Sequence, residues 1–144
     1  MSADAMASFY EDGREAERLT RGIGRLEAMR TLELLARHLP PPPAVVYDVG
    51  GATGYYAQWL GERGYSVHLL DGVTGHVDRA RQHAPRLLAS AQVGDARRLP
   101  WADESGDVVL LMGPMYHLCN RADRVRASPR RAACCERTAC SSAW

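Results

Sequence analysis

Three aspartates and a group of glycines are the residues of this chain whose types and spacing favour ligand binding. The glycines lie in "DVGGATG", which follows the short apolar run "AVVY". Asp48 precedes them, Asp71 ends the apolar stretch "VHLLD", and Asp95 ends "SAQVGD". Carboxylates accept hydrogen bonds from hydroxyl and amino groups, and glycine lets a backbone approach a ligand closely. The pattern therefore predicts a site for a ligand with several donors, such as a nucleotide with its ribose hydroxyls.

The spacing of the glycines argues against a dinucleotide site. The dinucleotide fingerprint is G-x-G-x-x-G, with an acid about 20 residues further on. Here Ala52 stands two positions after Gly50, and the next glycine after Gly51 is Gly54. Asp71 suits either type of nucleotide, because it can accept from ribose hydroxyls. A glycine loop alone is weak evidence, so a nicotinamide-dependent oxidoreductase stays open at this point.

The residues around these motifs predict strands that alternate with helices. Apolar residues recur with helical spacing between Arg25 and Leu39, and four prolines then favour an extended chain. The expected strands are 44–49, 65–71, 90–95 and 107–112, and the expected helices between them are 54–63 and 76–84. Such alternation favours an α/β fold with a parallel sheet and right-handed crossovers. The carboxyl ends of parallel strands meet at one edge, where open α/β sheets bind ligands, so the aspartates should lie together there.

Composition and charge exclude several other classes of protein. The 144 residues suffice for one domain with a single core, and a net charge of +1 gives no attraction to nucleic acid or an anionic membrane. No apolar run is long enough to span a bilayer, and the N-terminus lacks the apolar segment of a signal peptide. We therefore expect a cytoplasmic protein without a nucleic-acid or membrane partner. The four cysteines form no C-x-x-C pair, so we expect no metal site.

Four longer motifs, "VVYDVGGATG", "VHLLD", "GDARRLP" and "DVVLLMGPMYHL", follow one another in order. Together they resemble the class I S-adenosylmethionine-dependent methyltransferases, in particular those that act on small molecules. The resemblance covers roughly residues 9–126. It implies a Rossmann-like parallel sheet of strand order 3-2-1-4 with flanking helices, S-adenosylmethionine as cofactor, and methyl transfer to a small-molecule acceptor. Ala52 departs from the pattern, since many members have glycine there, but alanine is small enough for us to expect tolerance.

The resemblance also implies roles for the polar residues. Gly50 and its neighbours would line the amino-acid part of the cofactor, and Asp48 would hold either the loop or the cofactor ammonium through water. Asp71 would accept from both ribose hydroxyls. Asp95 would accept from the adenine amino group, with Ala96 packed beside the ring. Simpler interpretations stay open, since aspartates also cap loops and occupy solvated turns.

No catalytic residue follows from the resemblance. The cofactor sulfonium already carries an activated methyl group, so the protein mainly positions the reactants. Met112 and Gly113 would flank the methionine moiety, whereas His117 could serve as a base or simply pack. The residues expected to bind the cofactor are Asp48, Gly50, Gly51, Ala52, Gly54, Asp71, Gly72, Asp95, Ala96 and Met112.

Three regions are expected along the chain. Residues 1–39 resemble an N-terminal helical lid that includes Tyr10, residues 40–126 a partial S-adenosylmethionine-binding core, and residues 127–144 an aberrant, disordered tail. The tail is rich in arginine and cysteine and lacks the fifth strand of the family. Read in a shifted frame from Ala127, one permitted set of codons encodes an amphipathic helix, a turn and an apolar strand. We therefore hypothesise a frameshift that truncates a longer methyltransferase, with a genuine short protein as the alternative.

A truncated chain would have consequences for function. Strand 107–112 would form an apolar edge through which the chain could self-associate. Cofactor binding would be weak, with little or no turnover. A non-catalytic cofactor-binding or interaction fragment is therefore a further alternative.

Overall fold

A computed structural model describes residues 18–133 and 135–137 of the chain. The chain divides into two units, Met1–Leu39 and Pro40–Trp144. In the first unit, helix α3 spans Gly22–His38 and confirms the helix expected from the apolar spacing. It ends where Leu39, with extended backbone, precedes Pro40, because a residue before proline avoids the helical conformation. Residues 1–17 of the expected lid, including Tyr10, lie outside the described residues.

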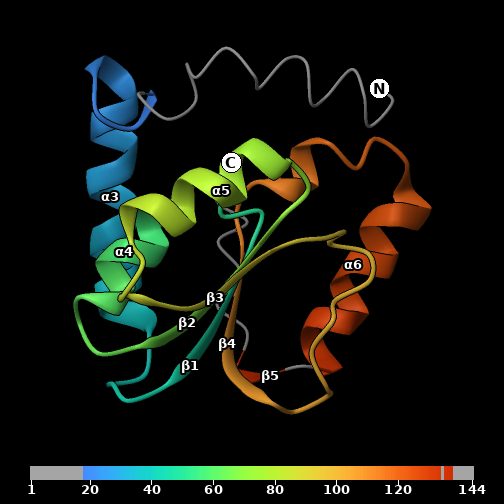
Figure 1. Cartoon of the computed structure of the whole chain (residues 1–144). Helices are drawn as coiled ribbons and strands as arrows, with labels where there is room; N and C mark the ends of the chain where they lie inside the picture. Colours follow the sequence, from blue (N-terminus) through green and yellow to red (C-terminus); the bar gives the residue numbers. More distant parts are fainter. Residues whose placement is uncertain (1–17, 134, 138–144) are drawn as a thin grey trace. The chain divides into compact units, whose positions relative to one another are not determined.

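The second unit is a parallel sheet with helices on both faces. The strands are β1 (Val45–Val49), β2 (Ser66–Asp71), β3 (Leu88–Val93), β4 (Gly106–Leu111) and β5 (Cys135–Arg137). The other elements are α4 (Tyr55–Gly61), α5 (Thr74–His83), the 3-10 turn η1 (Pro114–Tyr116) and α6 (Arg121–Ala133). All strand pairs are parallel, in the order β3-β2-β1-β4-β5. Helices α4 and α5 cover one face and α6 the other (Figure 1). The predicted α/β fold and the order 3-2-1-4 are thus confirmed.

Strand β1 is the centre of the sheet. It pairs with β2 on one side and β4 on the other, so that Asp48 lies opposite Leu69 and Leu110. Val46 and Val49 of the same strand are fully buried, as expected for a strand covered on both faces. Asp48 therefore stands within the apolar interior, close to the carboxyl end of β1. None of the helices in the described part of the chain is long and apolar enough to cross a membrane.

The described part of the tail differs from the expectation of disorder after Ala127. Helix α6 begins with Asp123 N donating to Asn120 Oδ1 at 3.0 Å and continues to residue 133. Strand β5 then pairs with Gly106 and Val108 of β4. The sheet thus gains a short fifth strand that we did not expect. The β4 edge is covered where β5 pairs with it, so self-association through this edge has no support in the described residues.

Candidate functional site

The chain turns sharply between β1 and α4. Gly50, Ala52 and Gly54 all have left-handed backbone, with φ of 74°, 48° and 84°. The amide of Gly50 donates to Leu70 O at 2.7 Å, and that of Gly54 donates to Gly51 O at 2.9 Å. Left-handed backbone carries no steric cost for glycine. The glycines of "GGATG" therefore fix the path of this turn at the carboxyl edge of the sheet.

The first two glycines leave no room for a side chain. A methyl group on Gly50 would lie 2.3 Å from Pro114 Cδ, and one on Gly51 would lie 2.5 Å from Asp48 Oδ2. The loops that follow β1 and β4 are thus packed against each other, and the Asp48 carboxyl lies against the backbone of the turn. The glycines are needed for close packing as well as for their conformations.

Ala52 is the strained position of the turn. We expect Ala52→Gly to raise the free energy of unfolding by about 0.5–1 kcal/mol. Removing the strain of a left-handed alanine stabilises the folded state by about 1–2 kcal/mol. The greater backbone freedom of glycine in the unfolded chain offsets about 0.5–1 kcal/mol of this gain. The amide that donates to Asp71 Oδ2 at 2.9 Å is kept. Urea unfolding measures the change. Ala57→Gly, a buried position inside α4, is the control and should instead destabilise by about 1 kcal/mol or more. Destabilisation by both substitutions would contradict strain at Ala52.

The Asp48 carboxyl lacks a partner for one of its oxygens. The residue is 2% exposed, and its Oδ2 has no hydrogen bond within the described structure. Burial, together with the negative charge of Asp71, raises the pKa of Asp48 to about 7. A buried carboxylate without a donor is costly, so this oxygen is suited to receive a cation or an N–H group from a ligand.

Asp71 joins three segments at the end of β2. Its Oδ1 accepts from Val73 N at 2.9 Å and lies 3.1 Å from His76 Nδ1, while its Oδ2 accepts from Ala52 N at 2.9 Å. The residue is only 8% exposed. Each carboxylate oxygen offers two lone-pair positions. Asp71 therefore shapes the turn and keeps acceptor capacity on Oδ2 for a ligand hydroxyl.

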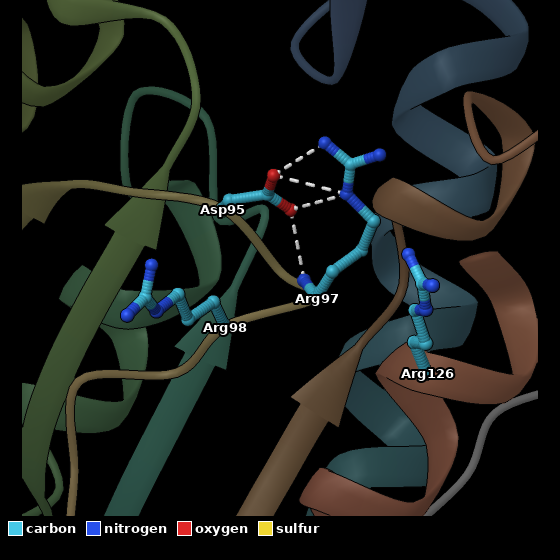
Figure 2. A pocket seen from close by; sticks show the side chains of 4 residues that line it. All are labelled: Asp95, Arg97, Arg98 and Arg126. Carbon is cyan, nitrogen blue, oxygen red and sulfur yellow. Dashed lines mark hydrogen bonds and ion pairs between the residues drawn. The ribbon is translucent and has the colours of Figure 1, made fainter.

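Asp95 follows β3 and is bound by Arg97, a residue for which we predicted no role. The Arg97 Nε lies 3.0 Å from each Asp95 oxygen, and Nη2 lies 2.6 Å from Oδ2 (Figure 2). These side-chain hydrogen bonds lower the pKa of Asp95. Ala96, between them, packs against the apolar cluster that contains Tyr47. The charge at position 97, two residues after the acid, was the only signal of this pairing in the sequence.

The structure brings most of the expected site residues to one edge of the sheet. Gly94, beside Asp95, donates its amide to Asp71 O at 2.9 Å. Met112, half-buried, follows β4, and a methyl group on Gly113 would lie 3.1 Å from Gly50 O. Gly72 is exposed directly after β2. The described residues contain no group of side chains that could hold a metal ion.

Comparison with known proteins decides the family. The model of the methyltransferase domain family matches residues 46–136, from β1 into β5. The chain belongs to this family. The malonyl-[acyl-carrier protein] O-methyltransferase of Methylococcus capsulatus is 35% identical over 108 residues, which are 72% of this chain and 39% of that protein. The demethylmenaquinone methyltransferase of Beutenbergia cavernae is 36% identical over 93 residues, which are 65% of this chain and 37% of that protein.

Solved structures show the same fold as this methyltransferase domain. A chain in the complex between the Haloferax volcanii Trm112 methyltransferase activator and the putative methyltransferase matches with a TM-score of 0.69 and 27% identity. The match covers 92% of this chain and 53% of that one. The domain thus spans about half of this structural relative, and less than half of the two curated relatives.

S-adenosylmethionine is the cofactor of this family, and the residues present fit it. The cofactor carries cationic groups, and the buried Asp48 oxygen lacks a partner within the described structure. It also carries ribose hydroxyls and an adenine amino group, for which Asp71 and Asp95 are acceptors at neighbouring strand ends. The turn at Gly50 and Gly51 admits no side chain and so presents bare backbone.

Proposed function

We propose that this domain binds S-adenosylmethionine at the carboxyl ends of β1 to β4, in a protein that transfers the methyl group to a small-molecule acceptor. The observation that carries the proposal is the buried Asp48 carboxyl beneath a glycine turn that is also bonded to Asp71. In a member of the methyltransferase domain family, this arrangement suits a ligand with a cationic amino-acid part and a ribose.

Each residue has a binding role in this proposal. Asp48 and the turn from Gly50 to Gly54 face the amino-acid part, and Asp71 with Gly72 receives the ribose. Asp95 and Ala96 receive the adenine, and Met112 lies beside the methionine moiety. When bound, the cofactor supplies an activated methyl group. The protein needs only to orient it toward the acceptor and exclude water.

The acceptor is proposed only as a class. By their names, one curated relative methylates malonyl-[acyl-carrier protein] and the other demethylmenaquinone. Two such different acceptors do not select one for this protein. Both relatives are methyltransferases, so they give no support to a nicotinamide-dependent oxidoreductase.

We expect S-adenosylmethionine and S-adenosylhomocysteine to raise the melting temperature of the protein, while NAD⁺ and NADP⁺ leave it unchanged. A ligand at 100 times its Kd stabilises the folded state by about 2.7 kcal/mol. Thermal denaturation with each ligand, followed by calorimetric titration, makes the measurement. The Gly75→Ala variant, altered where no atom lies within 4 Å of the new methyl group, should bind like the wild type. Stabilisation by NAD⁺, or by none of the four ligands, would contradict the proposal.

A further inference from the structure

The adenine end of the proposed site is occupied by a side chain of the protein itself. The guanidinium of Arg97 contacts both oxygens of Asp95, and the Arg97 amide donates to Asp95 Oδ1 at 2.8 Å (Figure 2). Paired contacts between a guanidinium and a carboxylate are the strongest and most directional of the common ion pairs. The oxygens that should receive the adenine amino group are therefore already in use.

A second carboxylate lies within reach of the same guanidinium. Arg97 Nη1 lies 3.2 Å from Asp123 Oδ2 on α6, and the Asp123 side chain is 19% exposed. Arg97 can thus leave Asp95 without losing every partner. The hollow that it borders is also lined by Arg98 and Arg126, so Asp95 is the single acid among four lining residues (Figure 2).

We propose that Arg97 sets the affinity and base selectivity of the cofactor site, because it competes with the adenine amino group for Asp95. This rests on the proposed function. An amino group can only donate to Asp95, so adenine binds after the guanidinium has moved onto Asp123. A purine with a carbonyl oxygen at the same position is repelled by the Asp95 carboxylate but accepted by Arg97. Arg97 therefore weakens adenine binding and reduces the preference for adenine over hypoxanthine.

The expected size of the effect follows from exposure. The Arg97 and Asp95 side chains are 43% and 47% exposed, so water and salt screen their attraction. A pair of this kind favours the paired state by up to about 1 kcal/mol, or about fivefold, which leaves Asp95 free in at least roughly one sixth of the molecules. Because the apparent affinity of a ligand falls in proportion to the fraction of protein that can bind it, Arg97 lowers the affinity for adenine ligands by up to about sixfold.

Calorimetric titration of the full chain with S-adenosylhomocysteine and S-inosylhomocysteine tests this competition. These uncharged-sulfur ligands differ at the amino position and avoid the direct charge effect of a sulfonium. We expect Arg97→Ala to bind S-adenosylhomocysteine about three- to fivefold more tightly than the wild type, and S-inosylhomocysteine no more tightly. Arg86→Ala, an equal charge change at an exposed position in the turn before β3 and outside the hollow, should leave both affinities unchanged. High salt should narrow the difference between wild type and Arg97→Ala, since it screens the pair.

Each other outcome overturns a specific claim. Unchanged or weaker S-adenosylhomocysteine binding by Arg97→Ala overturns the competition while leaving the proposed function intact. Equal tightening for both ligands, or the same gain in Arg86→Ala, shows a general charge effect and also overturns the competition. If neither wild type nor Arg97→Ala binds S-adenosylhomocysteine, the proposed function fails and this inference fails with it.

Discussion

Replacing Gly50 by alanine should lower the free energy of unfolding by about 2–5 kcal/mol. Left-handed backbone costs an alanine about 1–2 kcal/mol, and Gly50 has a φ of 74°. The new methyl group would also overlap Pro114 Cδ, 2.3 Å away, and such overpacking costs about 1–3 kcal/mol. Urea unfolding measures the loss, and calorimetric titration should show that S-adenosylhomocysteine binding is lost with the shape of the turn.

Two further variants isolate the cause of this loss. Gly75→Ala makes the same chemical change at the start of α5 in open space, so it should leave stability unchanged or raise it slightly. Pro114→Ala in the Gly50→Ala background removes the ring atoms that the new methyl group overlaps. It should therefore recover the part of the stability that was lost through overpacking. If Gly50→Ala were as mild as Gly75→Ala, the contact between the two loops would not fix the turn.

The stability of the protein should fall as pH rises from about 4 to about 7, because of Asp48. Burial raises the pKa of Asp48 to about 7, whereas an unfolded aspartate titrates near 4. The folded state holds the Asp48 proton more tightly than the unfolded state does. The contribution of this proton to the free energy of unfolding is therefore complete below pH 4, and it is lost as pH rises through the folded pKa. A difference of about three pKa units corresponds to about 4 kcal/mol.

Asp48→Asn is the variant that identifies this group. Its side chain stays neutral, so its urea-unfolding free energy should lack this decline between pH 4 and 8. Asp103→Asn, altered at an exposed carboxylate in the loop before β4, should keep the wild-type profile. Parallel profiles for the wild type and Asp48→Asn would show that Asp48 is ionised in the folded protein without cost.

The centre of the sheet could be predicted because β1 and β4 consist almost entirely of apolar residues. "VVYDV" and "VVLL" are buried on both faces, and their alternation with helices leaves few parallel topologies. The aspartates could be placed because each lies at or next to the carboxyl end of a strand. The hydrogen-bond partners of Asp71 could not be predicted, since they depend on how the turn at Ala52 and the start of α5 are oriented in space.

Other features of the site depend on conformations that residue types do not determine. Ala52 was expected to fit because alanine is small, yet its difficulty is a backbone angle rather than its size. Arg97 could equally have pointed to solvent, since a long arginine in a loop has many rotamers. Strand β5 escaped prediction because "CER" is short and polar, and its pairing comes from the open edge of β4.

The position of Asp71 also bears on the order in which the site is assembled. The hydrogen bonds to its carboxylate come from Ala52, Val73 and His76, so this corner of the site, which we propose receives the ribose, is built within a stretch from residue 52 to residue 76. Contacts between residues close in sequence form quickly, because little chain entropy is lost in closing the loop. This corner can therefore form as soon as β1, β2 and the first turn of α5 have met, before β4 is added to the sheet.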